Sequence, residues 1–311
     1  MPALKLRVIV NPRSGPARHR AARRAALAEA LAQLGAVASC VETRHPEDTA
    51  EQARLALREG CTDIVAVGGD GTVNEIAGVM AGSGATLGLV PAGSGNGLAR
   101  HLGIPLEPAA ALGLLRPGAG RRLAIDTGRA NGHFFINVMG LGFDAQVAAR
   151  FQQSPGRGLP GYARTAWRVW KEHRPEACRI EVDEEAWSQP VWLLTIANSA
   201  QYGNNVRIAR GASVADGRLD LLAIAPPGAW ELGRLGWRLL RGTLSGDRWV
   251  RQCRGTRFRI VRAGPGLIHL DGEARLSGAV VEVAVRPHDV RIWVPAAGGG
   301  DEPRRAEAAG N

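Results

Sequence analysis

The chain has 311 residues, a formal net charge of +10 and a sequence isoelectric point near 10.7. This length can bury the cores of one large or two medium domains, and we expect two. The sequence has no apolar run long enough to span a bilayer and no secretory signal, so it predicts a cytoplasmic protein. Its 4 cysteines are widely spaced and form no C-x-x-C pair, which argues against a disulfide framework or a zinc site.

Arginine supplies nearly all of the positive charge, because Lys5 and Lys171 are the only lysines. Such a charge favours an anionic partner: a phosphorylated substrate, an anionic membrane surface or nucleic acid. A GC-rich genome would also enrich arginine, so the bias alone does not choose among them. Since the arginines are dispersed and no nucleic-acid-binding module is recognised, we expect no nucleic-acid partner. The sequence leaves open whether the protein forms a homodimer.

The first part of the chain alternates predicted strands and helices. We predict strands at 5–10, 36–41, 63–67 and 87–90, and helices at 18–34, 47–59, 73–80, 98–102 and 107–115. This alternation predicts an α/β domain with a mainly parallel sheet and helices on both faces. Ligands bind such sheets at the carboxyl ends of the strands.

Two glycine-rich turns each join a predicted strand to a predicted helix. They are Gly68-Gly69-Asp70-Gly71-Thr72 and Gly93-Ser94-Gly95-Asn96-Gly97. Glycine lets the backbone approach a ligand closely, and the start of a helix offers unpaired N–H groups to a phosphate. Either turn alone would be explained equally well as an ordinary tight turn. Two such turns in one sheet favour a phosphate site.

From Leu123 onward the pattern changes to short strands separated by turns. We predict strands at 124–129, 133–138, 179–183, 191–198, 219–223, 257–261, 267–270 and 280–285. They indicate an antiparallel β-sandwich, interrupted by helices at 161–173 and 229–243. The expected domains are a nucleotide-binding domain at 1–123 and a sandwich domain at 124–288. A last strand at 290–294 would return to the first domain, followed by a disordered tail at 296–311.

Several motifs carry a resemblance that covers most of the chain. In chain order they are Asn11-Pro12-Arg13-Ser14-Gly15, Val67 to Glu75, Pro91 to Asn96, Gly140-Leu141-Gly142-Phe143-Asp144-Ala145, Asp216-Gly217-Arg218-Leu219-Asp220 and Asp271-Gly272-Glu273. Their sequence and order resemble those of the diacylglycerol kinase catalytic-domain family. This family holds bacterial lipid kinases and is related to sphingosine and ceramide kinases.

The resemblance implies an ATP-dependent lipid kinase that uses Mg²⁺ and works at the inner face of the membrane as a peripheral protein. The residues that it assigns to the nucleotide are Asn11, Ser14, Gly15, Thr43, Gly68, Gly69, Asp70, Gly71, Thr72, Val73, Asn74, Glu75, Gly93, Ser94 and Asn96. Those assigned to metal ions are Asp70 and Asp126, and, for a second ion, Ser213, Asp216 and Arg218. Glu273 is the expected general base, with Asp271 as its rival.

Each of these assignments has a plainer alternative. Asp70 could simply form a turn or cap a helix. If the strand before Asp271 continues, Asp271 and Glu273 face the same side and one of them binds its proton more tightly. Asp-Gly is also a strong signal for a hairpin turn, and without the resemblance we would favour that turn. The segment from Ser213 to Arg218 could be an ordinary loop.

Gly97 departs from the diacylglycerol kinase pattern, in which an aspartate usually follows the asparagine of the second turn. One carboxylate of the expected magnesium network is therefore missing, and the turn looks more like that of sphingosine and ceramide kinases. A non-catalytic lipid or nucleotide sensor stays open for this reason. NAD kinase shares the Gly-Gly-Asp-Gly-Thr turn and is a second rival, although the downstream motifs favour a lipid kinase.

Two predicted helices combine basic side chains with tryptophan. The first carries Arg164, Trp167, Arg168, Trp170, Lys171 and Arg174, and the second carries Trp230, Arg234, Trp237 and Arg241. This combination suits an anionic lipid surface. Alternatively, the tryptophans pack in a core while the arginines face water.

Overall fold

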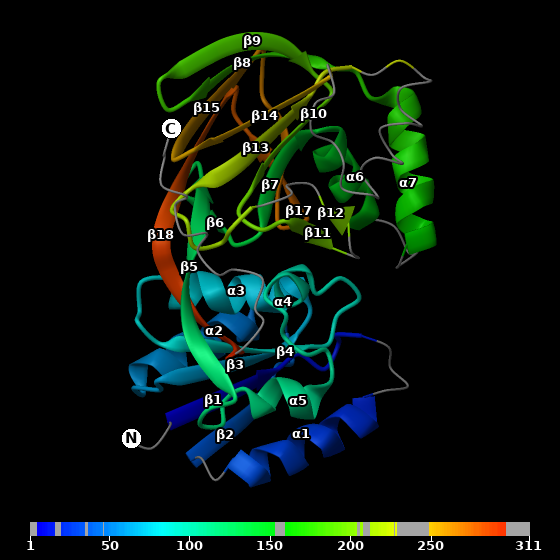
Figure 1. Cartoon of the computed structure of the whole chain (residues 1–311). Coiled ribbons are helices and arrows are strands. Elements are labelled where there is room, and N and C mark those ends of the chain that lie inside the picture. Colours follow the sequence, from blue (N-terminus) through cyan, green and yellow to red (C-terminus); the bar gives the residue numbers. More distant parts are fainter. Residues whose placement is uncertain are drawn as a thin grey trace, which may run out of the picture. The chain divides into compact units, whose positions relative to one another are not determined.

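The computed structural model describes residues 5–15, 20–34, 37–45, 47–152, 159–203, 206–207, 212–226, 228 and 249–296. The chain forms two compact units, shown in Figure 1. The first comprises Met1–Asp126, Ser213–Asp216 and Pro287–Asn311, and the second Thr127–Ala212 and Gly217–Arg286. Strands β5 (Gly120–Ala130) and β18 (Val280–Pro295) each contribute residues to both units.

The first unit is built on a parallel sheet. Its strands follow the order β2 (Val37–Glu42), β1 (Lys5–Val10), β3 (Asp63–Gly68), β4 (Thr86–Pro91) and the last part of β18. All of these neighbours are parallel, and β18 joins through the pairs of Arg291 with Thr86 and Ile292 with Leu87. Every residue of β3 and β4 is buried, which explains their continuous apolar sequences.

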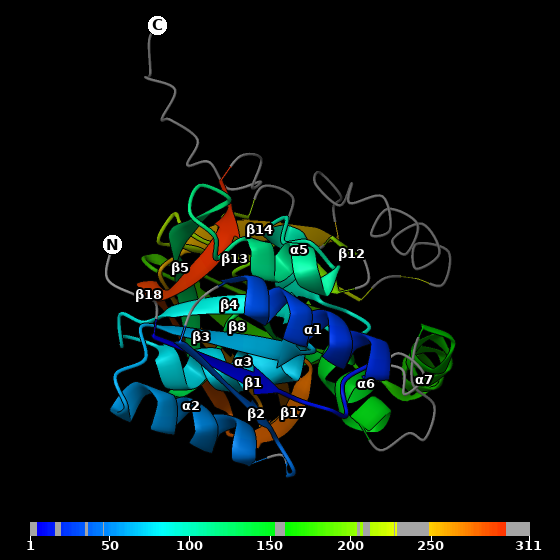
Figure 2. The same ribbon diagram turned by 90° about the horizontal axis from the view of Figure 1, so that it is seen from below.

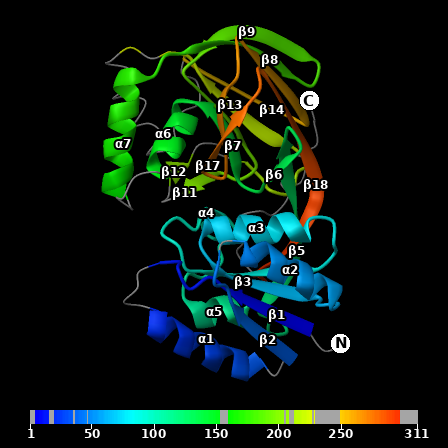
Figure 3. The ribbon, with the colours of Figure 1, turned by 180° about the vertical axis from the view of Figure 1, so that it is seen from behind.

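Helices cover both faces of this sheet. On one face α1 (Arg20–Leu34) packs against α5 (Pro108–Gly113), and on the other α2 (Asp48–Arg58) packs against α3 (Asp70–Met80). Figures 2 and 3 show these two helix pairs on opposite sides of the strands. A short helix, α4 (Gly97–His101), follows the second glycine turn. The predicted α/β architecture of the N-terminal part is therefore confirmed.

The second unit consists of two antiparallel sheets. One follows the order β14 (Val250–Gly255), β13 (Leu219–Ile224), β10 (Leu193–Ala197), β7 (Val138–Gly142), β16 (Gly266–Leu270) and β17 (Glu273–Ser277). The other joins the first part of β18 to β15 (Arg257–Arg262), β8 (Glu176–Val182) and β9 (Glu185–Val191), with β5 and β6 (His133–Phe135) beside them. A separate hairpin pairs β11 (Gln201–Gly203) with β12 (Val206–Arg207).

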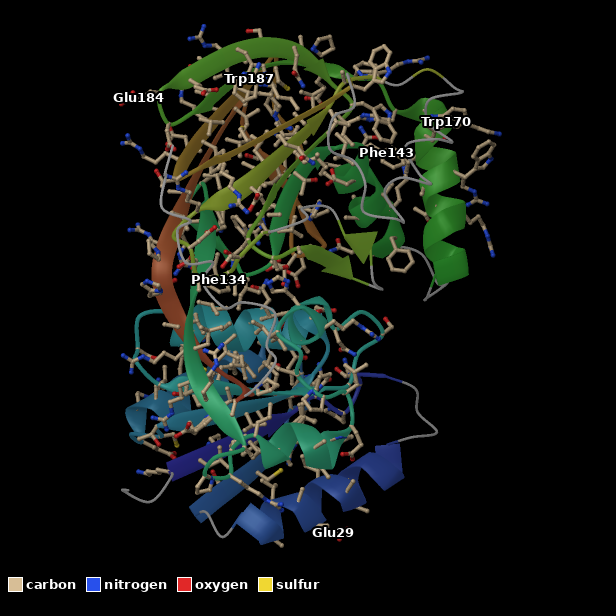
Figure 4. The ribbon with its side chains drawn as sticks, in the orientation of Figure 1. Glu29, Phe134, Phe143, Trp170, Glu184 and Trp187 are labelled. Atoms are coloured by element: carbon tan, nitrogen blue, oxygen red, sulfur yellow. The ribbon has the colours of Figure 1, made fainter. Side chains whose placement is uncertain are left out.

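One apolar core joins the two sheets of the second unit. It takes side chains from both, among them Leu141, Leu194 and Leu221 from the first sheet and Ile180 and Ile260 from the second. This confirms the predicted antiparallel sandwich. A smaller cluster around Trp192 packs against Phe143 of α6 (Phe143–Gln152) and Trp170 of α7 (Leu159–Glu172). Figure 4 shows both of these aromatic side chains beside the two helices.

Several features of the fold differ from the sequence-based expectation. Helix α6 was not predicted, and the segments predicted at 280–285 and 290–294 form the single strand β18. The Ser213–Asp216 segment groups with the first unit although it lies within the expected sandwich region.

In the described part of the chain, no helix is both long and apolar enough to cross a membrane. The helix predicted at 229–243 and the residues after 296 lie outside the described residues.

Candidate active site

The strand order of the first unit predicts where a ligand binds. The chain leaves β1 toward β2 on one side and leaves β3 toward β4 on the other, so the connections diverge between β1 and β3. In open parallel sheets this switch point, at the carboxyl ends of the strands, is the usual ligand site. The loop after β1 begins at Asn11, and the loop after β3 is the first glycine turn.

Hydrogen bonds tie these two loops together. The backbone N–H of Asn11 donates to the carbonyl oxygen of Val67 at 2.9 Å, and its side-chain amide donates to the hydroxyl of Thr72 at 2.9 Å. The backbone N–H of Gly69 donates to the hydroxyl of Ser14 at 3.3 Å. Two loops that are distant in sequence are thus hydrogen-bonded to each other at one edge of the sheet.

A cavity of about 240 Å³ lies at this edge. Its lining residues are Asn11, Arg13, Ser14, Thr43, Arg44, His45, Thr49, Gly69, Gly71, Thr72 and Glu75. Seven of them were predicted as nucleotide residues: Asn11, Ser14, Thr43, Gly69, Gly71, Thr72 and Glu75. Hydroxyls, glycine backbone and arginines around a small cavity suit the binding of a polyphosphate, and Glu75 adds one carboxylate to the lining.

The sequence analysis did not predict four of the lining residues: Arg13, Arg44, His45 and Thr49. Two of them, Arg44 and His45, lie on the segment between β2 and α2, and Thr49 lies in the first turn of α2. The carboxylate of Asp48 holds that segment. It accepts the backbone N–H groups of Arg44 at 2.7 Å and of His45 at 2.9 Å. These bonds keep the pKa of Asp48 below its usual value. The available signal in the sequence was the run His45-Pro46-Glu47-Asp48, which begins four residues after the end of the predicted strand at 36–41.

Glycine is required where the two glycine turns approach each other. A Cβ atom on Gly93 would lie 2.7 Å from the Cα atom of Gly69, and one on Gly68 would lie 2.4 Å from the Cβ atom of Thr72. The Gly93 contact is with the backbone of the other turn, so a side chain there would push the two turns apart. The Gly68 contact is with the Thr72 side chain, so a larger residue at 68 would displace that side chain within the first turn. The structure thus brings both predicted turns together.

Asp70 connects the two turns directly. Its carboxylate accepts the backbone N–H of Asn96 at 2.8 Å and that of Gly97 at 2.7 Å. Asn96 precedes α4 with a φ of 51°, a left-handed conformation that asparagine tolerates. Asp70 therefore caps the N-terminus of α4, so the helix-capping alternative describes part of its role. The cavity lining does not include Asp70, Gly15, Gly68, Val73, Asn74, Gly93, Ser94 or Asn96.

The residues predicted to bind metal ions do not form a cluster of acidic side chains. Asp126 is buried, and its carboxylate accepts the backbone N–H of His288 at 2.9 Å. Ser213 and Asp216 belong to the first unit, whereas Arg218 belongs to the second. Among the described residues, no three His, Cys, Asp or Glu side chains could together hold a metal ion. Mg²⁺, however, usually takes one or two carboxylates together with water and phosphate oxygens, so it does not require such a cluster.

The Asp271-Gly272 pair forms the turn between β16 and β17. Asp271 has a φ of 49° and Gly272 a φ of 87°, and Leu270 pairs with Glu273 across the hairpin. Two consecutive residues with positive φ are the mark of a two-residue hairpin turn. The strand does not continue, so the argument that placed both carboxylates on one side of it is wrong. The hairpin alternative is confirmed.

The carboxylate of Asp271 is fully engaged with the backbone. It accepts N–H groups from Ile136 at 2.8 Å, Asn137 at 2.9 Å and Val138 at 2.8 Å. Burial raises the pKa of Asp271 to about 6, against the opposing effect of these three donors and of His269. Glu273 is exposed. Of the two carboxylates, Glu273 is the one presented to solvent.

Helix α7 presents a basic and aromatic surface, formed by the exposed residues Arg164, Trp167, Arg168 and Lys171. The ring of Trp167 is stacked on that of Trp170 with centroids 5.0 Å apart, and the Lys171 ammonium lies 5.2 Å from the Trp167 centroid. Trp167 is 56% exposed, whereas Trp170 packs against the cluster around Trp192. Trp170 therefore follows the interpretation as a core residue, whereas Trp167 is exposed.

Comparison with known proteins agrees with this architecture. Residues 5–130 match the family described as "Diacylglycerol kinase catalytic domain", and residues 137–294 match "YegS C-terminal NAD kinase beta sandwich-like domain". A crystal structure of a diacylglycerol kinase from Bacillus anthracis superimposes with a TM-score of 0.74 at 17% identity, covering 96% of this chain and 99% of that one. At this identity the likeness establishes the fold.

Two curated relatives extend the match in sequence. A "Probable lipid kinase YegS-like" of Pseudomonas aeruginosa is 36% identical over 246 residues, which cover 78% of this chain and 79% of the relative. The "Diacylglycerol kinase" of Bacillus subtilis is 29% identical over 284 residues, covering 86% of this chain and 89% of the relative. The chain therefore belongs to the diacylglycerol kinase catalytic-domain family of kinases.

Proposed function

We propose that this protein is an ATP-dependent lipid kinase that phosphorylates the hydroxyl of a membrane lipid, either diacylglycerol or a sphingoid or ceramide lipid. The observation that carries the proposal is the cavity at the carboxyl ends of β1 and β3, where seven residues predicted to bind nucleotide meet. The names of the relatives support kinase chemistry on a lipid.

In the first unit, backbone N–H groups and hydroxyls would bind the phosphates of ATP. Two hydrogen bonds hold the loops that carry these groups in place before the nucleotide binds. They join Asn11 to Thr72 and Gly69 to Ser14. Preorganised donors stabilise the charge that builds up on a phosphoryl group in transfer. Bound Mg²⁺ would screen the phosphate charge, and Asp70 would hold it from the first glycine turn. Glu75, which lines the cavity, is a second carboxylate on this edge. Thr43, which lines the same cavity, would contact the adenine side.

In the second unit, Glu273 would accept the proton of the lipid hydroxyl. The hydroxyl oxygen forms a bond to the γ-phosphorus, the bond from that phosphorus to the bridging oxygen breaks, and ADP leaves. An exposed carboxylate beside a fixed turn suits this task better than Asp271, whose two oxygens already accept three N–H groups. The asymmetry supports Glu273 as the base and Asp271 as the residue that fixes the turn.

The α7 surface would contact the membrane that holds the substrate. Tryptophan prefers the boundary between lipid and water, and Arg and Lys are attracted to anionic headgroups. Trp167 and Lys171 combine the two properties on one exposed face. The protein would then associate peripherally with the cytoplasmic side of the membrane.

NAD is the second candidate acceptor, because the C-terminal match is described as similar to the sandwich of NAD kinase. A sensor that binds nucleotide without catalysis is the third candidate, because Gly97 replaces a carboxylate.

One experiment separates these functions. The purified protein is incubated with γ-labelled ATP, Mg²⁺ and four acceptors in turn: vesicles containing diacylglycerol, sphingosine or ceramide, and free NAD. The lipid kinase predicts label in one lipid and none in NAD. Label only in NAD would contradict it in favour of the second candidate. Nucleotide binding without label in any acceptor would favour the sensor. Glu273→Gln should abolish most of the labelling of the lipid. Glu184→Gln is its matched control, since Glu184 is exposed and follows Asp183 in the turn between β8 and β9.

A further inference from the structure

Asp144 and His269 form a buried polar pair in the second unit. The Nε2 atom of His269 lies 3.0 Å from Oδ2 of Asp144, and their side chains are only 1% and 5% exposed, respectively. The hydroxyl of Thr195 also donates to Oδ2 at 3.3 Å, and the backbone N–H of Ala145 donates to Oδ1 at 2.8 Å. A buried carboxylate is stable only with such partners, and here both of its oxygens have them.

Space for this pair depends on a glycine. A Cβ atom on Gly140 would lie 2.1 Å from Oδ2 of Asp144 and 2.5 Å from Nε2 of His269. Gly140 stands directly opposite His269 where β7 pairs with β16. The Gly140 to Ala145 motif therefore has a physical explanation: its glycine makes room for the contact that its aspartate makes.

The other ring nitrogen of His269 reaches the turn before Glu273. Its Nδ1 atom accepts the backbone N–H of Gly272 at 3.3 Å. A neutral imidazole that accepts at Nδ1 must carry its proton on Nε2, and the Asp144 carboxylate beside Nε2 favours that form. Asp144 thus determines which nitrogen of His269 accepts the N–H of Gly272.

The remaining polar groups of the turn are held as well. The side-chain amide of Gln152 at the end of α6 donates to the carbonyl oxygen of Gly272 at 3.2 Å. The backbone N–H of Asp271 donates to the carbonyl oxygen of Val138 at 2.8 Å. The turn is thus fixed from α6, from β7 and from the buried pair. Glu273 is the next residue in the chain.

We infer that Asp144 and His269 are positioning residues for Glu273. They fix the turn, and with it the direction in which the Glu273 side chain leaves β17, without touching the substrate themselves. The inference rests on the proposed role of Glu273 as the base. Misplacing a reacting group by about 1 Å can lower a rate about 10²-fold, so the turn has to be held closely.

Asp144→Asn tests the inference. The amide has only one acceptor oxygen. That oxygen keeps the shortest contact, with the Ala145 N–H at 2.8 Å, so the N–H₂ group faces His269 and Thr195. His269 can satisfy that group only by moving its proton to Nδ1, which turns a donor toward Gly272. We expect ¹⁵N NMR of the ring to report this tautomer and hydrogen exchange of the Gly272 amide to accelerate. The kcat should fall about 10²-fold while the KM for ATP stays within about twofold.

His173→Asn is the matched control. His173 is also a buried histidine of the second unit, and its Nε2 lies 2.9 Å from the carbonyl oxygen of Trp192. We expect it to lower stability with kcat unchanged. The inference is overturned if Asp144→Asn lowers kcat no more than this control does, or if it leaves the tautomer and the Gly272 exchange unchanged.

The unsubstituted protein provides a measurement that does not depend on a variant folding or on activity. Its His269 should carry the proton on Nε2 at neutral pH, with slow exchange at Gly272. A proton on Nδ1 would overturn the inference. If the protein phosphorylates no lipid, the proposed function fails, whereas these two readouts still decide whether the pair holds the turn.

Discussion

The carboxylate of Asp70 accepts the backbone N–H of Gly97 at 2.7 Å, so the first residue of α3 binds the first residue of α4. Its other oxygen accepts the N–H of Asn96 at 2.8 Å. The start of a helix leaves N–H groups without intrahelical partners, and these bonds satisfy two of them. Asp70 therefore holds the two glycine turns together, in addition to its proposed contact with Mg²⁺.

Asp70→Asn separates the structural role of Asp70, which is to hold the second glycine turn, from its proposed role in binding Mg²⁺. The amide offers one acceptor oxygen for two N–H groups, so we expect the free energy of unfolding to fall by about 1–3 kcal/mol. We also expect Mg²⁺ to lose its ability to strengthen ADP binding, because the amide lacks the charge that attracts the ion. Calorimetric titration with ADP, with and without Mg²⁺, measures this.

Asp48→Asn is the control, because Asp48 also accepts two backbone N–H groups in the first unit. It should lower stability and leave the Mg²⁺ dependence in place. If Asp70→Asn retained the full effect of Mg²⁺ on ADP binding, Asp70 would be only a cap.

Gly97→Asp should restore the missing carboxylate. Gly97 starts α4 without a positive φ, so an L-amino acid meets no backbone strain there, and an acidic residue is favourable at a helix N-terminus. Two neighbouring carboxylates repel each other unless a cation lies between them. We therefore expect a lower Mg²⁺ concentration for half-maximal rate and a melting temperature that rises more steeply with Mg²⁺. Gly97→Asn controls for size. An active Gly97→Asp variant with unchanged Mg²⁺ dependence would argue against a shared carboxylate network.

Glu273→Gln should lower kcat by about 10²–10⁴-fold, which is the usual contribution of a general base, with little change in ATP affinity. Asp271→Asn should lower kcat less and stability more, because its carboxylate binds the N–H groups of Ile136, Asn137 and Val138. Initial rates and chemical unfolding measure the two effects. The reverse ranking in kcat would make Asp271 the base.

The raised pKa of Asp271 predicts a pH-dependent stability. Between about pH 4, where an unfolded aspartate titrates, and about pH 6, the folded protein holds the proton more tightly than the unfolded chain does. The folded state is therefore favoured below this window and loses that advantage as the pH rises through it. The difference in unfolding free energy between the unsubstituted protein and Asp271→Asn should shrink by up to about 3 kcal/mol across the window. A difference that stays constant with pH would show that the Asp271 pKa is not raised.

The α7 surface predicts opposite behaviour of two neighbouring tryptophans. Trp167→Ala should weaken sedimentation with anionic vesicles, most clearly at low salt, and leave the melting temperature nearly unchanged, because Trp167 is 56% exposed. Trp170→Ala should lower the melting temperature, because Trp170 packs against the cluster around Trp192. Unaltered vesicle binding by Trp167→Ala would remove α7 from the membrane contact.

The sequence by itself determined most of the local structure and the parts of the nucleotide site. The buried strands before both glycine turns, the α/β alternation and the change to short strands near residue 123 were readable, because periodicity and glycine content are properties of short segments. Helix α6 was missed because its sequence, Phe143–Gln152, follows a glycine-rich strand without a clear apolar period. The sequence indicated a possible Asp-Gly turn, but it did not decide between that turn and a continuing strand.

The tertiary structure decided which distant groups meet. It placed Asp70 against Gly97, 27 residues away in the chain, and His269 against Asp144, 125 residues away. It also paired the Asp271 carboxylate with Ile136, Asn137 and Val138, and added Arg44 and His45 to the cavity. Local sequence preferences act over a few residues, whereas such partners depend on the strand order and on the packing that brings chain segments together. For that reason the residue types of the site could be predicted from the sequence, whereas the hydrogen-bond partners of each carboxylate could not.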